Sequence, residues 1–411
     1  MATALSEADA SGGDSEGGDF FGRLPAEAPD SLLHLIKLAK ADGRDSKIDL
    51  GVGVYRDADG GTPILRAVKE AERRLWERQG TKAYLGPEGD LAFVGHVKRM
   101  LLGEALASDD RIVGVQTPGG CGAVRLAAEL VRVANPDARV FVGRPTWPNH
   151  EPLIGATGLE LVDYAYYDPA RASLNFDAML GALRLGRAGD VILLQGSCHN
   201  PTGADLSPEQ WAEVADLIVA RGLVPLVDTA YQGLGDGLEP DAAGTRLIVE
   251  RSPVALVAQS CDKNFGLYRE RTGSLFVKAE SPAQAATVFG NLLGLGRRMW
   301  SMPPDHGAAL VRMVFEEPDL EADWRAELDA MGARVRELRA RLAGQDGRLA
   351  YIAGQKGMFS ILPLKPEAVD RLQAEHGFYM ARSGRINVAG FAGHEIPLFV
   401  DAIRPYLPDA L

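Results

Sequence analysis

Short apolar runs alternate with amphipathic stretches through the middle of the chain. Stretches of helical period, such as 120–134 and 208–221, separate the apolar runs. The runs predict buried strands at 111–116, 139–143, 160–166, 190–195, 223–228, 254–260 and 273–277. Apolar strands that alternate with helices are typical of a mostly parallel sheet with helices on both faces. The pattern therefore predicts an α/β domain.

The pattern before this region is different. Residues 30–40 have apolar positions at helical spacing, and Gly43 follows as a stop signal. The segment IDLGVGVY reads as a short extended stretch. A helix is expected to open at Thr62-Pro63 and to run through Trp76, because the first turn of a helix tolerates proline.

The pattern after about residue 310 indicates a second, α+β domain. A long charged helix is expected at 318–343, followed by short strands near 358–363 and 385–389 and a final helix from about 394. A chain of 411 residues is longer than one core usually supports. We predict a large domain at 61–314, and a small domain made of 23–60 together with 315–411.

Composition narrows the class of protein. Residues 1–22 are rich in Gly, Ser, Asp and Glu, so we predict a disordered tail there. The net charge of −12 argues against nucleic acid or an anionic membrane surface as partner. No apolar run approaches the roughly 18 residues of a membrane helix, and the three cysteines and seven histidines lack metal-ligand spacing. We expect a cytoplasmic protein without a bound metal.

Polar residues gather where several predicted strands end. TPGGCGA at 117–123 is a glycine-rich turn that leads into a helix and presents N–H groups to a phosphate. Later strands are followed by HNPTG (199–203), DTAYQG (228–233) and SCDKNFGLYRER (260–271). A single Asp in such a place is more often a helix cap, and a single Lys is usually solvated. Together, an acid, a phenol, a lysine and an arginine at one sheet edge favour a ligand site.

In this order, the segments resemble the class I aminotransferases, and most of all the aspartate and aromatic amino acid aminotransferases. The resemblance runs from about residue 21 to the C-terminus and rests on GVGVY, TKAYLGPEG, TPGGCGA, PTWPNH, HNPTG, DTAYQG, DKNFGLYRERTG, WSMPP and SGRINVAG. It implies the fold type I of enzymes that use pyridoxal 5'-phosphate (PLP). It also implies transamination of aspartate, glutamate, phenylalanine, tyrosine or tryptophan with 2-oxoglutarate by a ping-pong mechanism.

The resemblance assigns roles around the cofactor. Lys263 would carry PLP as a Schiff base and shuttle the proton, while Asp228 would keep the pyridine nitrogen protonated. Arg271 would bind the phosphate through two hydrogen bonds. The remaining cofactor residues are Asn200 and Tyr231 at the phenolate oxygen, Trp147 on the ring face, His150 behind Asp228, and Gly119, Gly120, Cys121 and Ser260 around the phosphate.

The resemblance also implies a homodimer with shared active sites. Arg385 would bind the α-carboxylate of the substrate, and Arg297 of the neighbouring subunit its distal carboxylate. Tyr84 would reach the phosphate across the interface. Gly53, Trp147, Asn200 and Phe359 would line the substrate pocket.

Several positions depart from the family pattern. Cys121 stands where threonine is usual, Asp262 where serine is common, and Gln195 where histidine is frequent. A carboxylate at Asp262 would weaken phosphate binding if it points into the cup and would be silent if it points away. These departures indicate a divergent member, but they leave Lys263 and Asp228 in place.

Three other interpretations stay open at this level. Another fold type I reaction, such as decarboxylation, elimination or racemisation, uses the same cofactor linkage. A non-catalytic PLP-binding paralogue is disfavoured because the lysine and the ring aspartate are present. A nucleotide-binding α/β protein is poorly supported because the turn at 117–123 lacks the GxGxxG spacing.

Overall fold

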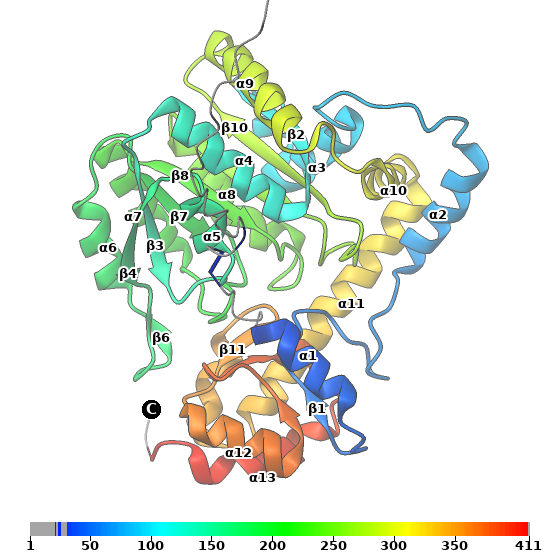
Figure 1. The fold of residues 1–411 in the computed structure, drawn as a ribbon, viewed down its shortest axis with the longest axis vertical. Coiled ribbons are helices and arrows are strands. Elements are labelled where there is room, and N and C mark those ends of the chain that lie inside the picture. Colours follow the sequence, from blue (N-terminus) through cyan, green and yellow to red (C-terminus); the bar gives the residue numbers. More distant parts are fainter. Residues whose placement is uncertain (1–20, 22–23, 26–30, 410–411) are drawn as a thin grey trace, which may run out of the picture.

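A seven-stranded sheet forms the centre of the larger part of the molecule (Figure 1). The computed structural model describes residues 21, 24–25 and 31–409. In spatial order the strands are β2 (Ile112–Pro118), β10 (Thr272–Lys278), β9 (Ala255–Ser260), β8 (Val224–Thr229), β7 (Val191–Gln195), β3 (Arg139–Arg144) and β4 (Glu160–Ala165). β10 runs antiparallel to both neighbours, and the other pairs are parallel. The predicted mostly parallel sheet is confirmed.

Helices cover both faces of this sheet, which explains the nearly continuous apolar strands. Alternate residues of one strand enter different cores: Val140 and Val142 lie in one core cluster, and Phe141 lies in the other. The first face is covered by α4 (Gly119–Ala134), α5 (His150–Gly155) and α9 (Pro282–Trp300). The second is covered by α3 (Leu91–Ala107), α6 (Phe176–Arg184), α7 (Pro208–Arg221), α8 (Leu238–Arg251) and α10 (Asp305–Glu316).

The sheet register places the polar strand ends at one edge. Gln195 at the end of β7 pairs with Asp228 near the end of β8, and Ser260 at the end of β9 pairs with Gly273. α4 starts at Gly119, directly after β2. The segments that follow β2, β7, β8 and β9 therefore begin close together.

The helix α2 (Arg66–Arg78) begins later than the sequence predicted. The chain is still extended at Leu65, with φ −59° and ψ 141°. The carboxylate of Glu327 accepts hydrogen bonds from the backbone N–H groups of Arg66 and Ala67, at 2.9 and 3.2 Å. A distant carboxylate thus caps the helix at Arg66, and the proline at position 63 precedes it.

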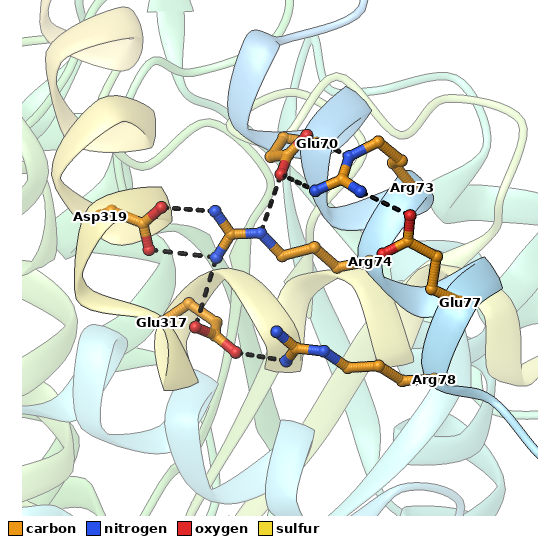
Figure 2. Close-up of polar contacts among 7 residues, drawn as sticks. All are labelled: Glu70, Arg73, Arg74, Glu77, Arg78, Glu317 and Asp319. Carbon is orange, nitrogen blue, oxygen red and sulfur yellow. Dashed lines mark hydrogen bonds and ion pairs between the residues drawn. The ribbon is translucent and has the colours of Figure 1, made fainter.

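Charged side chains connect α2 to α11 (Pro318–Ala343), the long helix that runs between the two parts of the molecule (Figures 1 and 2). Arg74 contacts Asp319 at 2.5 Å and Glu317 at 3.3 Å. Arg78 contacts the other oxygen of Glu317 at 2.5 Å. Because one acidic pair faces two arginines, α2 is fastened to the start of α11 by a network rather than by a single ion pair.

A smaller group of elements packs around the second half of α11. Ile48 and Leu50 share one buried core with Leu338, Phe378 and Phe399. The elements are α1 (Ser31–Ala41), β1 (Ile48–Asp49) parallel to β12 (Phe378–Tyr379), β11 (Phe359–Ile361) antiparallel to β13 (Arg385–Asn387), α12 (Pro366–His376), α13 (Glu395–Ile403) and the 3-10 turns Gly347–Gly354, Val388–Gly390 and Arg404–Tyr406. The short hairpin β5 (Tyr167–Asp168) and β6 (Ser173–Leu174) projects from the larger part. The domain boundaries at 61 and 315 remain a prediction.

Two expectations concern the ends of elements. The strand expected at 385–389 stops at Asn387, because the Asn387 side chain accepts a hydrogen bond from the N–H of Ala389 at 3.1 Å and starts a 3-10 turn. Except for residue 21, the predicted tail at 1–22 lies outside the described residues. Within the described ranges, none of the helices has the length and apolar character needed to cross a bilayer.

Candidate active site

A hollow opens at the carboxyl edge of the sheet. It is lined by Gly120, Cys121, Trp147, Gln195, Asn200, Asp228, Ala230, Tyr231, Ser260, Asp262, Lys263 and Arg271. These residues lie at or after the ends of β2, β3, β7, β8 and β9, so the sheet brings together segments that are distant in sequence. Most of the predicted cofactor residues are among them.

Lys263 follows β9 and projects into the hollow. Its Nζ lies 5.6 Å from the ring centres of both Tyr231 and Tyr268. Burial lowers the pKa of the Lys263 amine, although the carboxylates of Asp262 and Asp228 oppose that shift. A lowered pKa favours the neutral amine, which is the nucleophilic form.

Asp228 is held by a directional chain of hydrogen bonds. Its Oδ2 lies 2.9 Å from Nε2 of His150, whose Nδ1 lies 2.7 Å from the hydroxyl of Thr146. The amide nitrogen of Gln195 donates to the same hydroxyl at 3.3 Å. If the Thr146 hydroxyl donates to Nδ1, the proton of His150 is on Nε2 and points at Asp228. This order gives every group a compatible partner.

Gln195 is the member of this chain that the sequence did not explain. Its Oε1 accepts from the backbone N–H of Asn200 at 2.8 Å, and its Nε2 donates to the Asn200 carbonyl at 3.0 Å. The backbone of Asn200 thus fixes the orientation of the Gln195 amide. The importance of Thr146 was also missed, although it belongs to the PTWPNH segment.

Asn200 and Tyr231 form a second polar pair. The Asn200 amide nitrogen donates to the Tyr231 hydroxyl at 3.1 Å. Burial is the main reason that the pKa of Tyr231 is raised, and the Asp228 carboxylate adds to it. The phenol therefore stays protonated at neutral pH and can donate a hydrogen bond.

The glycine-rich turn packs tightly against Arg271. Gly119 has φ +68°, and a Cβ there would lie 2.5 Å from Nη2 of Arg271. A Cβ on Gly120 would lie 3.2 Å from the Cβ of Ser260. The first turn of α4 therefore approaches Arg271 and Ser260 as a cup in which backbone N–H groups face a basic side chain. Burial raises the pKa of the Cys121 thiol, which remains a weak donor in this cup.

Arg385 reaches the same region from the smaller part of the molecule. It is 5% exposed, donates to the Gly51 carbonyl at 2.7 Å and lies 4.8 Å from the ring centre of Phe359. The Phe359 ring meets Tyr231 edge-on at 6.0 Å. A Cβ on Gly53 would lie 3.0 Å from the tip of Phe359, so a larger residue there would require the ring to shift slightly. Burial lowers the pKa of Arg385.

Two predicted site residues lie away from this hollow. Tyr84 is 93% exposed, and Arg297 is exposed at the end of α9 beside Arg298, which is also exposed. Their contribution to a site from a second subunit remains a prediction.

Some buried polar atoms at the site have no partner within residues 31–409. They are Oδ1 of Asn200, Oδ1 of Asp262 and Nε of Arg385. Buried polar atoms are almost always hydrogen-bonded in folded proteins. Two of the three atoms belong to residues that line the hollow, Asn200 and Asp262.

Comparisons with known proteins agree with this geometry. A family model described as aminotransferase class I and II matches residues 45–403. The tyrosine aminotransferase of Rhizobium meliloti is 51% identical over 375 residues, 90% of this chain and 96% of the relative. The aspartate aminotransferase of Escherichia coli is 41% identical over 391 residues, 93% and 99% of the two chains. An aromatic amino acid aminotransferase structure from Burkholderia pseudomallei, covalently bound to pyridoxal phosphate, is 39% identical, covers 95% of this chain and 100% of that one, and has a TM-score of 0.91.

Proposed function

The chain belongs to the class I and II aminotransferases, and from that premise we propose how its active site transfers the amino group of aspartate and aromatic amino acids. It is a PLP-dependent aminotransferase of the aspartate and aromatic amino acid subgroup. The observation that supports the residue roles most directly is that Lys263, Asp228 and Arg271 line one hollow although they come from three different segments.

The residues of the hollow fit the cofactor. A phosphate matches the cup of Gly119, Gly120 and Arg271, where any side chain on Gly119 would collide with the guanidinium. The Asn200 amide nitrogen and the Tyr231 hydroxyl, 3.1 Å apart in the hollow, are donors that suit the phenolate oxygen of the ring. When bound, PLP supplies a protonated pyridine ring that withdraws electrons from the α-carbon of the substrate.

Asp228 has the task of keeping the pyridine nitrogen protonated. A buried carboxylate does this only if it stays ionised and correctly oriented. The hydrogen bond from His150, at 2.9 Å, fixes the orientation of the Asp228 carboxylate, and Thr146 and Gln195 fix His150 in turn. His150, Thr146 and Gln195 thus together orient the Asp228 carboxylate towards the proton on the pyridine nitrogen.

Lys263 has two tasks. Its amine would hold the cofactor covalently, and the free amine would move the proton at the substrate α-carbon. The amine must be neutral for both, and burial lowers its pKa in that direction. Asn200 and Tyr231 hold the phenolate oxygen of the ring.

The substrate carboxylates are assigned to two arginines. Arg385, buried beside Phe359, binds the α-carboxylate of every substrate. Arg297 of the partner subunit binds the distal carboxylate of aspartate or glutamate and turns away for an aromatic ring. Tyr84 and Arg297 are both exposed in the single chain, which supports a homodimer with shared active sites. A cytoplasmic location also remains part of the proposal.

The test of the chemistry is a half-reaction. The purified enzyme with PLP is mixed with aspartate, phenylalanine or tyrosine without an oxo acid, and the absorbance change to the pyridoxamine form is followed for each donor. Conversion with aspartate and an aromatic donor supports the proposal. If the cofactor binds but no donor converts it, the assignment of substrates is wrong.

The lysine role is tested by Lys263→Ala. We expect complete loss of turnover, because no other lysine lines the hollow among the described residues. Lys356→Ala serves as the control, since this lysine pairs with Asp236 outside the hollow. Native activity in Lys263→Ala would refute the assignment.

A further inference from the structure

Asp262 carries a carboxylate inside the proposed phosphate cup. It stands directly before Lys263 and is 7% exposed. Its Oδ2 lies 2.7 Å from Nη1 of Arg271, and its Oδ1 has no hydrogen-bond partner in the described structure. The backbone N–H of Asp262 donates to Oγ of Ser260 at 3.1 Å. The side chain therefore points into the cup and not away from it.

Arg271 is already occupied by this carboxylate. The same Nη1 also donates to the Tyr268 carbonyl at 3.0 Å. Burial works against the charge of Arg271, but the Asp262 carboxylate, with a further contribution from Cys121, opposes burial and the pKa of the guanidinium is raised. An anionic ligand that approaches Arg271 thus meets a guanidinium whose charge is already balanced by Asp262.

The charges in the cup make Asp262 a competitor of the phosphate. Among the described residues that line the hollow, the basic side chains are Lys263 and Arg271 and the carboxylates are Asp228 and Asp262. Lys263 and Asp228 are assigned to the cofactor ring, so Arg271 is left to serve both the phosphate and Asp262. The start of α4 adds a partial positive charge, and the thiol of Cys121 adds little.

We propose that Asp262 is an internal counter-anion that holds Arg271 in the cofactor-free protein and weakens binding of the cofactor phosphate. This inference rests on the proposed phosphate role of Arg271. It predicts opposite effects of removing the carboxylate. The cofactor-free protein loses stability because Arg271 is left without a counter-charge, whereas phosphate ligands bind more tightly because a like charge is gone.

The experiment uses the full-length chain after removal of the cofactor. Native protein, Asp262→Asn and Asp262→Ser are titrated with pyridoxamine phosphate, which has the phosphate and the ring but no aldehyde to bond Lys263. We expect both variants to bind it about tenfold more tightly, the order that one unbalanced charge in a partly buried site produces. Inorganic phosphate is expected to raise the melting temperature of both variants more than that of the native protein.

A matched control is available at the opposite edge of the sheet. Asp109 pairs with Arg111 at 2.7 Å just before β2, the same distance as the pair in the cup. Asp109→Asn removes an equal charge, and we expect its affinity for pyridoxamine phosphate to stay native. A purely structural role of Asp262 predicts lower stability together with equal or weaker binding, and that result would overturn the proposal.

Arg271→Gln separates this inference from the proposed function. If the phosphate binds at Arg271, this change weakens binding in both the native and the Asp262→Asn background. Native affinity in Arg271→Gln would show that the phosphate role itself is wrong. Weaker binding in Arg271→Gln together with unchanged binding in both Asp262 variants would refute the counter-anion alone.

Discussion

Burial lowers the pKa of Lys263. The buried amine that the chemistry needs therefore also lowers the stability of the folded protein. Between the lowered value and about 10.4, the unfolded chain binds a proton at this lysine that the folded chain does not. The stability of the cofactor-free protein therefore rises with pH through this window. Below the window the full penalty of a buried charge is present.

Lys263→Met is expected to stabilise the cofactor-free protein at pH 7 while it removes turnover. The methionine keeps the volume of the side chain and removes the charge that burial opposes. The stability advantage should shrink as the pH rises towards 10, because the lysine of the unfolded chain then loses its proton as well. Urea unfolding of both proteins between pH 7 and 10 measures the difference. Lys69→Met, at an exposed lysine, is the control, and equal stability of native and Lys263→Met at pH 7 would contradict this account.

At this scale the sequence predicted residue types better than side-chain directions. Lys263, Asp228, Asn200 and Arg271 were expected together because each belongs to a polar segment at the end of a predicted strand. The sequence left open whether the Asp262 carboxylate points into the phosphate cup or away from it. Only the position of Arg271, nine residues away in the chain, decides that the carboxylate points into the cup.

The apolar pattern predicted the helices and strands correctly where buried positions repeat at a regular spacing. The strands and the helices at 208–221 and 318–343 were predicted closely, since their periods reflect which faces are covered. The start of α2 was not, because its cap is Glu327, 261 residues from Arg66. A cap supplied from so far away leaves no trace in the local pattern.

The segment that holds Phe359 depends on one buried arginine of α11. Arg339 is 2% exposed, and burial lowers its pKa to about 10. Its guanidinium donates to the carbonyl oxygens of Gly357 (2.8 Å), Ile352 (3.4 Å), Lys356 (2.9 Å) and Phe359 (2.5 Å) and to Oγ of Ser360 (2.8 Å). These acceptors run from the 3-10 turn at 347–354 through the loop that follows it into β11.

Arg339→Met is expected to lower the free energy of unfolding by about 3 kcal/mol or more, because several buried carbonyl groups lose their donor. Because Phe359 packs against Arg385, the KM for amino acid donors should rise as well. Chemical denaturation and steady-state kinetics measure the two effects. Arg336→Met, at an exposed arginine of the same helix that donates to Gly235, should cost about 1 kcal/mol or less. Equal losses in the two variants would show that the buried network has no special role.

At the scale of the whole molecule, the sequence predicted the sheet but not its order. Seven strands and a mostly parallel arrangement followed from the pattern, but the insertion of β10 between β2 and β9 did not. That antiparallel strand matters for the site because it begins at the carboxyl edge of the sheet. Thr272 pairs with Pro118, so Arg271, the residue before the strand, lies beside Gly119. Strand order depends on contacts between distant segments, which apolar periods do not encode.

The proposed dimer makes a prediction about mixtures of inactive subunits. Lys263→Ala removes the lysine of a subunit's own site, whereas Arg297→Ala removes the arginine that the subunit lends to its partner. In a hybrid dimer one site then carries both defects and the other carries neither. Random reassociation of equal amounts should restore about a quarter of native turnover with aspartate, since half of the dimers are hybrids and each has one intact site.

The same mixture shows whether Arg297 acts within its own chain. In that case neither subunit of the hybrid has both residues, and turnover stays at the level of the separate variants. Arg298→Ala is the matched control, because Arg298 is also exposed on α9 but is not assigned to the substrate; alone it should keep native turnover with aspartate. The opposite result is that Arg298→Ala loses turnover with aspartate and regains it when mixed with Lys263→Ala subunits. That result would support a shared site but would assign the distal carboxylate of the substrate to Arg298.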